Sequence, residues 1–177
     1  MPLPLHEAAA VDCLQATNFT FLFAPAYHPA MKAVVPIRGA LSVRTVFNVL
    51  GPLTNPAAPP YQLIGAYSKE AAKLMADTLS GMPLERAFVV HGEPGWDEAT
   101  PAGDFVLYDV RPGSVVEETR SPGDYGLALC TPEALEGGDA EHNARELIRV
   151  FTGDDKGAHR DALLMGTSLV LEVQGVV

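Results

Sequence analysis

The sequence of residues 61–90 is YQLIGAYSKEAAKLMADTLSGMPLERAFVV, and its pattern decides the fold. Tyr61–Tyr67 and Arg86–Val90 are short, mostly apolar stretches with the length of buried strands. Lys69–Leu79, which lies between them, has apolar residues at helical spacing and predicts an amphipathic helix. A strand, a helix and a strand in this order form a βαβ unit, whose strands pair in parallel. The sequence therefore predicts an α/β fold.

The chain after this unit predicts more sheet and two more helices. Asp104–Val110 and Ser114–Thr119 alternate between apolar and polar residues and are separated by a Pro-Gly turn, which is typical of a β-hairpin. Asp139–Phe151 and His159–Val173 have helical patterns. We therefore expect a mixed sheet flanked by helices.

The chain before residue 61 gives shorter signals. The alanine-rich residues 6–16 favour a helix, and the apolar run Phe19–Ala24 has the length of a buried strand. His28-Pro29 is typical of a helix start, and Pro36 should kink or end that helix. The apolar run Thr45–Leu50 fits either a helix or a strand.

Composition excludes several classes of protein. Of the 177 residues, 47% are hydrophobic and 19% are charged, which is typical of a globular chain. The formal net charge of −10 disfavours general binding of nucleic acids, which requires clustered Lys and Arg. The sequence has no apolar run of membrane-spanning length, no signal-peptide pattern and no disulfide framework. We expect a cytoplasmic protein without nucleic-acid or membrane partners, forming a single α/β domain over residues 1–177.

One candidate binding stripe lies in the helix that we expect after position 28. His28, Met31, Val35 and Arg38 would share a face of that helix, three or four residues apart. Such a stripe could hold a small aromatic anion, with Arg38 on the carboxylate and Met31 on the ring. The alternative is a helix that packs through Met31 and Val35 while His28 caps it and Arg38 is solvated. Spacing alone favours this alternative.

A second candidate is the segment Gly51–Ala57, which has the sequence GPLTNPA. Its Gly-Pro and Asn-Pro pairs predict a rigid turn with accessible backbone. Such a turn can form one wall of a pocket or can simply reverse the chain. The segment alone favours the simple turn.

A third candidate follows the second strand of the βαβ unit directly. Residues 91–98 have the sequence HGEPGWDE, and ligands of open α/β sheets bind at the carboxyl ends of strands. The adjacent carboxylates of Asp97 and Glu98 could both turn toward one Mg²⁺, which takes one or two carboxylates and completes its shell with water and phosphates. The alternative is a pair of acids that is solvated or that favours a helix N-terminus. The residues alone leave both interpretations open.

Three longer motifs together resemble those of the anthranilate phosphoribosyltransferases. They are Phe21–Met31 (FLFAPAYHPAM), Val43–Pro56 (VRTVFNVLGPLTNP) and Val89–Glu98 (VVHGEPGWDE). The resemblance extends over nearly the whole chain. It implies the class II nucleoside phosphorylase-like fold, in which a helical domain accompanies an α/β phosphoribosyl-transfer domain, and it implies a homodimer for the full-length protein.

The resemblance also implies an activity and a set of site residues. The family transfers a phosphoribosyl group from phosphoribosyl pyrophosphate to the amine of anthranilate, in tryptophan biosynthesis, with Mg²⁺ as cofactor. Arg38 would contact the anthranilate carboxylate, and Asp97 and Glu98 would bind Mg²⁺. The resemblance identifies no catalytic acid or base. The remaining residues implied to line the anthranilate pocket are Tyr27, His28, Met31, Gly51 and Pro52.

The sequence departs from the family pattern chiefly by what it lacks. The glycine-rich pyrophosphate loop and the Lys-His-Gly-Asn segment of the family have no equivalent in this chain. We therefore expect the C-terminal part of the α/β domain, with a partial central sheet flanked by helices and little turnover by the chain alone. Two other hypotheses remain: a non-catalytic binding or self-associating protein, and an enzyme similar to a pyrimidine nucleoside phosphorylase.

Overall fold

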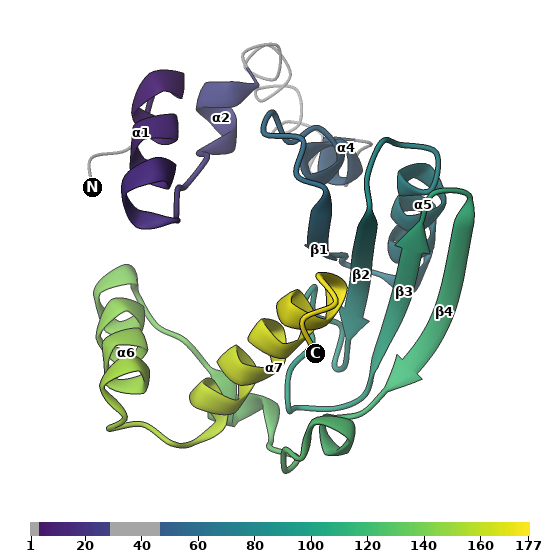
Figure 1. The fold of residues 1–177 in the computed structure, drawn as a ribbon. Coiled ribbons are helices and arrows are strands. Elements are labelled where there is room, and N and C mark those ends of the chain that lie inside the picture. Colours follow the sequence, from purple (N-terminus) through teal and green to yellow (C-terminus); the bar gives the residue numbers. More distant parts are fainter. Residues whose placement is uncertain (1–3, 29–46) are drawn as a thin grey trace, which may run out of the picture. The chain divides into compact units, whose positions relative to one another are not determined.

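The structure is a computed structural model that describes residues 4–28 and 47–177 (Figure 1). It divides into two compact units, Met1–Ala57 and Ala58–Val177, each of which is described by itself. The first unit contains the helices α1 (Glu7–Thr17), α2 (Ala24–Tyr27) and α4 (Phe47–Leu53). Helix α1 confirms the helix predicted over residues 6–16 and begins at His6, whose side chain accepts a hydrogen bond from the backbone of Ala9.

The strand predicted over Phe19–Ala24 is wrong. Ala24 begins helix α2, and the preceding residues form no strand in the described structure. The side chains of Phe19, Phe21 and Phe23 are exposed rather than buried. A strand exists only where a neighbour completes its backbone hydrogen bonds, and no described segment pairs with these residues.

The rigid turn predicted from Gly51 begins later than expected. Gly51, Pro52 and Leu53 belong to helix α4, which also identifies the ambiguous run before them as helical from Phe47 onward. Proline fixes φ at a helical value, so the last turn of α4 accommodates Pro52 with the loss of one hydrogen bond. The turn itself starts at Thr54, whose hydroxyl donates to the carbonyl of Leu50 at 2.9 Å.

The second unit is built on a four-stranded sheet with the order β1-β2-β3-β4. Its strands are β1 (Tyr61–Gly65), β2 (Arg86–Gly92), β3 (Phe105–Arg111) and β4 (Ser114–Arg120). Strands β1 and β2 pair in parallel, whereas β3 and β4 add antiparallel neighbours. The predicted βαβ unit and the predicted hairpin are both confirmed, and the sheet is mixed as expected.

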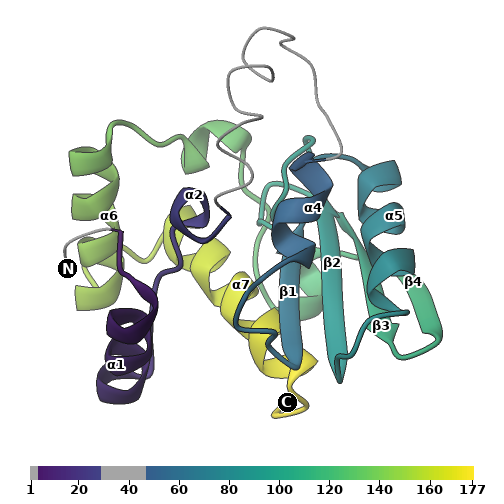
Figure 2. The ribbon, with the colours of Figure 1, turned by 90° about the horizontal axis from the view of Figure 1, so that it is seen from above.

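Two helices cover opposite faces of this sheet (Figure 2). Helix α5 (Lys69–Leu79), bounded as predicted, is capped by Ser68 and buries Met75 and Leu79. Helix α7 (Ala158–Val173) buries Met165, Leu169 and Val173 against the other face. Side chains alternate across a strand, so the residues of β2 and β3 that contact α7 are every second one. The core on this face contains Phe88, Val90, Ala99, Phe105, Leu107, Met165, Leu169 and Val173.

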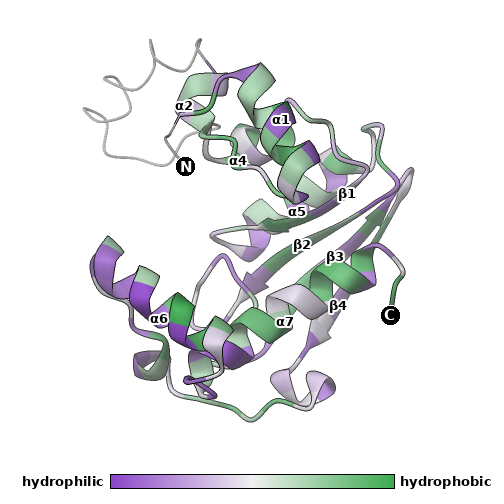
Figure 3. Ribbon diagram, turned by 60° about the vertical axis from the view of Figure 1, so that its left-hand side comes forward, coloured by the Kyte–Doolittle hydropathy of each residue, from purple (hydrophilic) through white to green (hydrophobic). Residues whose placement is uncertain are grey.

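The connection from β4 to α7 contains the 3-10 helices η2 (Pro122–Tyr125) and η3 (Pro132–Leu135) and the helix α6 (Ala140–Thr152). Helix α6 carries both hydrophilic and hydrophobic residues, whereas β2 and β3 are mostly hydrophobic (Figure 3). None of the residues of α6 is fully buried. No helix of the described ranges is both long and apolar enough to cross a membrane.

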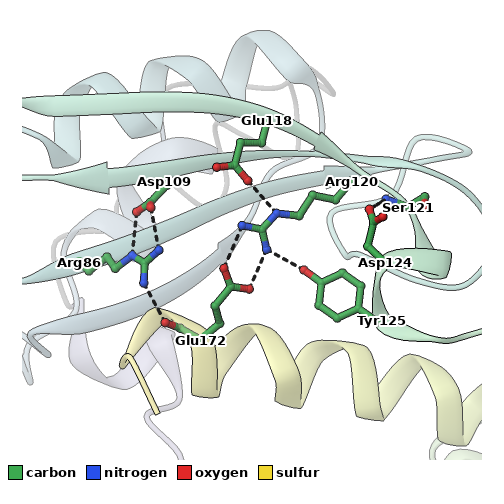
Figure 4. A network of polar contacts seen from close by, with 8 residues as sticks. All are labelled: Arg86, Asp109, Glu118, Arg120, Ser121, Asp124, Tyr125 and Glu172. Carbon is green, nitrogen blue, oxygen red and sulfur yellow. Dashed lines mark hydrogen bonds and ion pairs between the residues drawn. The ribbon is translucent and has the colours of Figure 1, made fainter. Parts of the chain in front are cut away.

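A polar network fastens the end of α7 to the sheet (Figure 4). The Arg86 guanidinium donates two hydrogen bonds to Asp109, at 2.8 and 2.7 Å, and a third to the backbone carbonyl of Glu172 at 2.8 Å. Arg120 donates to Glu172, Glu118 and the Tyr125 hydroxyl. Hydrogen bonding to carboxylates raises the pKa of both guanidinium groups, so both stay charged.

Candidate functional site

The candidate site begins where strand β2 ends, at Gly92. The backbone N–H of Gly92 donates to the carbonyl of Trp96 at 2.9 Å, and the N–H of Trp96 donates to the carbonyl of Gly92 at 2.9 Å. This two-bond bridge closes a tight turn and sends the chain back toward the sheet. Asp97 and Glu98, the next two residues, therefore lie at the carboxyl ends of the parallel strands, where α/β sheets bind ligands.

The backbone of Asp97 and Glu98, called the acidic pair below, closely approaches two glycines. A Cβ atom at Gly65, the last residue of β1, would overlap the backbone carbonyl of Asp97. A Cβ atom at Gly92, the last residue of β2, would overlap the backbone carbonyl of Glu98. Glycine in a strand often marks a site where another backbone approaches closely, and both positions are of this kind.

Further contacts hold the ends of the two strands together. The His91 ring Nδ1 lies 2.8 Å from the carbonyl oxygen of Ala66, just beyond β1. The N–H of Ala66 donates to the carbonyl of Val90 at 2.9 Å. Beyond the acidic pair, Ala99 and Thr100 are buried, with 7% and 4% of their surface exposed. The acidic segment is therefore anchored on both sides.

Asp97 and Glu98 line a cleft of about 890 Å³ that belongs wholly to the second unit. Its walls come from the sheet, the acidic segment, α6 and α7. Four carboxylates line it, and none of the described lining residues is Lys or Arg. The cleft therefore favours cations, and a phosphate could enter only with a cation or with basic groups from elsewhere. The ionisable lining residues are Asp97, Glu98, Glu136, His142, Glu146 and His159.

The acidic pair fits Mg²⁺ better than a metal that needs a complete protein cage. Both side chains are exposed, and neither accepts a hydrogen bond or forms an ion pair within the described ranges. The described residues contain no group of three or more His, Cys, Asp or Glu that could hold a metal. Mg²⁺ uses one or two carboxylates and retains water and substrate phosphates as its other ligands, so two free carboxylates suit it.

The residues expected to line the anthranilate pocket are not all described. Met31 and Arg38 lie outside the described residues, as does Val35. Tyr27 ends helix α2, and its hydroxyl donates to the carbonyl of Leu5 at 2.9 Å. His28 caps the same helix, and its N–H donates to the carbonyl of Ala24 at 3.0 Å.

Gly51 and Pro52, the other two predicted pocket residues, lie in helix α4 rather than in a loop. They belong to the first unit, together with Tyr27 and His28, whereas Asp97 and Glu98 belong to the second. Asp97 and Glu98 both line the cleft, and metal binding by the pair remains a prediction. The aromatic-anion pocket remains a prediction.

Sequence reasoning missed the part that Gly65 plays in this site. The one signal for it was a glycine inside the predicted strand Tyr61–Tyr67, because glycine in a strand often marks the close approach of another backbone. It also missed the contribution of α6 and α7 to the cleft. No local sequence motif indicates that these helices line the cleft, because their contribution depends on how they pack.

The whole chain, residues 1–177, matches the family described as "Glycosyl transferase family, a/b domain". The chain belongs to this family. Its relatives within the glycosyl transferase family include the anthranilate phosphoribosyltransferases of Rubrobacter xylanophilus, 44% identical over 92% of this chain, and of Solibacter usitatus, 43% identical over 99%. These matches cover 48% and 51% of the two relatives, so the chain spans about half their length.

Solved structures of the same kind of transferase have the same fold. Anthranilate phosphoribosyltransferase from Thermus thermophilus is 38% identical, with a TM-score of 0.84, and the match covers 95% of this chain and 49% of that one. The Saccharomyces cerevisiae enzyme in complex with PRPP and Mg is 31% identical, with a TM-score of 0.85, over 97% of this chain and 50% of that one. The same yeast enzyme with 4-fluoroanthranilate also has a TM-score of 0.85, at 30% identity over the same shares of the two chains. The α/β fold class predicted from the sequence is confirmed.

Proposed function

We propose that this chain forms part of an anthranilate phosphoribosyltransferase, which transfers a phosphoribosyl group from phosphoribosyl pyrophosphate to the amine of anthranilate. One observation carries the proposal. In a chain similar to transferases of that name, two carboxylates lie at the carboxyl ends of the parallel strands and line a cleft whose described lining residues include no Lys or Arg. A cation held by the carboxylates would allow a diphosphate to bind there.

The metal part of the proposal assigns Mg²⁺ to Asp97 and Glu98. Magnesium bound there would neutralise charge on the diphosphate leaving group. Asp97 and Glu98 would hold the cation where they line the cleft, while Trp96 and Ala99 keep the segment against the sheet. The protein has little covalent chemistry to perform, because positioning of two substrates and stabilisation of the leaving charge carry most of such a reaction.

The anthranilate part of the proposal rests on the sequence motifs. Arg38 would pair with the carboxylate of anthranilate, because a guanidinium can bind a carboxylate with two hydrogen bonds. The whole protein would be a cytoplasmic homodimer. Five further residues would line the pocket for the ring, namely Tyr27, His28, Met31, Gly51 and Pro52.

The metal assignment can be tested without turnover. Trp96 is the single tryptophan of the chain and precedes Asp97 directly, so Mn²⁺ bound to the pair should quench its fluorescence. We expect Asp97→Asn to weaken Mn²⁺ binding by about 10-fold or more, because one of two charged ligands is lost. Glu93→Gln removes an exposed carboxylate from the same loop and should leave the affinity unchanged. Equal affinities for the wild-type chain and Asp97→Asn would contradict the assignment.

The substrate assignment can be tested by titrating anthranilate, which is itself fluorescent, with the chain. Arg38→Ala should weaken binding by about 10-fold or more, because a charge-assisted pair is lost. Lys32→Ala, which removes a positive charge six positions earlier in the sequence, is the control. Anthranilate consumption with phosphoribosyl pyrophosphate and Mg²⁺ should be slow for the chain alone, and Asp97→Ala should abolish any that occurs. Binding of a pyrimidine nucleoside in place of anthranilate would overturn the assignment.

A further inference from the structure

We propose that Gly65 and Gly92 are positioning residues for the acidic pair: each leaves room for one backbone carbonyl, and together they fix where the Asp97 and Glu98 carboxylates stand. The geometric part of this inference rests on the contacts of the chain itself. Only its consequence for metal binding rests on the function proposed above.

The two glycines share one face of the sheet. In the parallel pairing, Gly65 of β1 lies opposite Val90 of β2, and Gly92 is two residues further along β2. Because side chains alternate along a strand, Gly92 shares its face with Val90, which packs against α7. Gly65 shares its face with Leu63, which packs against the same core cluster. Both glycines therefore open toward the cleft side of the sheet.

The acidic segment fills the space that two side chains would otherwise occupy. The atoms that a Cβ would meet are the backbone carbonyl of Asp97 at Gly65 and the backbone carbonyl of Glu98 at Gly92. A flexible side chain could rotate away from such an overlap, but a backbone carbonyl moves only if the segment moves. Any residue other than glycine at either position must therefore displace one of the two carboxylate-bearing residues.

The segment cannot absorb that displacement by sliding. On one side the two hydrogen bonds between Gly92 and Trp96 fix its start. On the other side Ala99 belongs to the buried core against α7, and Thr100 is buried as well. A side chain introduced at position 65 or 92 would therefore displace the two residues between these anchors, Asp97 and Glu98.

Nothing else in the described structure orients the two carboxylates. In most metal sites, hydrogen bonds to the ligands from neighbouring side chains set their orientation, and removing such a partner typically weakens metal affinity by about 10–100-fold. The Asp97 and Glu98 side chains have no such partner among the described residues. The close approach of their backbone to the two glycines takes over this role.

The test compares three glycine-to-alanine variants, two at the ends of the parallel strands and one in helix α7. Gly65→Ala and Gly92→Ala place a methyl group against the acidic backbone. Gly166→Ala is the matched control, because Gly166 of α7 lines the same cleft but has open space around an added Cβ. Quenching of Trp96 by Mn²⁺ gives the metal affinity at a temperature where circular dichroism shows each variant to be folded. We expect Gly65→Ala and Gly92→Ala to bind about 10–100-fold more weakly and Gly166→Ala to match the wild-type chain.

A purely structural role would give a different result. Gly65→Ala and Gly92→Ala would then lower the temperature of unfolding while the folded chains bound Mn²⁺ as tightly as the wild type, and this outcome would overturn the proposal. If neither variant folds, hydrogen exchange of the unaltered chain decides. We expect the Trp96 amide to be protected without metal, and protection that appears only after Mn²⁺ is added would refute a prearranged pair.

Failure of the proposed function would look different again. If Mn²⁺ does not change the Trp96 fluorescence of the wild-type chain, the assignment of the metal to Asp97 and Glu98 is wrong. The exchange of the Trp96 amide in the metal-free chain would still show whether the acidic segment is held in place. The two proposals can therefore fail separately.

Discussion

The Arg120 guanidinium binds both carboxylate oxygens of Glu172, with nitrogen–oxygen distances of 2.7 and 2.9 Å. The two residues are 52 positions apart, in strand β4 and in the last turn of helix α7. The pair is only partly accessible, with 17% and 26% of the two side chains exposed. It therefore ties one wall of the cleft to the sheet at the end of α7 that lies beyond the lining residues.

Removing the charge of Glu172 should lower the stability of the second unit. We expect Glu172→Gln to reduce the free energy of unfolding by about 2 kcal/mol, because a charge-assisted pair is lost and Arg120 keeps only its weaker partners. Urea unfolding followed by Trp96 fluorescence measures this unit. Lys73→Gln breaks an exposed ion pair with Asp77 and should change the free energy by less than about 0.5 kcal/mol. Equal losses in the two variants would contradict the role of the network.

The contact between α7 and the sheet should be more sensitive to cavities than to surface changes. Met165 is fully buried between α7 and the sheet, so Met165→Ala should cost about 2–5 kcal/mol through lost burial and an unfilled cavity. Leu164, the preceding residue, is 39% exposed, and Leu164→Ala should cost less than about 1 kcal/mol. The same urea titration compares the two. A similar cost at both positions would show that α7 is not packed as described.

Helix α5 depends on the residue that precedes it, Ser68, for a partner to one of its free backbone N–H groups. The Ser68 hydroxyl accepts a hydrogen bond from the N–H of Ala71 at 3.1 Å. Ser68→Ala should therefore cost about 1 kcal/mol, whereas Ser68→Asp, which keeps an acceptor at the same place, should restore most of the loss. Thermal unfolding by circular dichroism gives both values. A full loss in Ser68→Asp would indicate that the hydroxyl has another function.

The sequence predicted the second unit well because its elements are specified locally. Lys69–Leu79 has a complete amphipathic repeat and a serine cap, and the strands on either side of it are paired with each other. The run Phe19–Ala24 is mostly apolar, like the two strands of the βαβ unit, but no described strand pairs with it. The composition of a segment does not show whether another segment is available to pair with it. The turn predicted from Gly51 begins later than expected for a different reason. Glycine and proline favour turns, but the last turn of a helix can also accommodate both.

The place of the candidate site in the fold was predictable from the sequence, whereas the contacts that support it were not. Asp97 and Glu98 follow a recognisable strand, so their place at the sheet edge followed from topology. The Gly65 contact joins residues 32 positions apart through backbone atoms, and no side-chain pattern reports such a contact. The network of Arg86 and Arg120 is similar, because each of the two pairs with residues of distant elements.

Stability should also depend on alkaline pH through Tyr108. Burial, together with hydrogen bonding to Glu117 on the neighbouring strand, raises the pKa of Tyr108 above its ordinary value of 10.0. Because the unfolded chain loses this proton first, the neutral phenol stabilises the fold fully below pH 10, and this contribution is lost as the pH rises through the higher folded value. Tyr108→Phe should therefore make the decline of unfolding free energy above pH 10 less steep, by at most about 1.4 kcal/mol per pH unit. Parallel slopes for the wild type and Tyr108→Phe would show that the phenol titrates alike in the folded and unfolded chains.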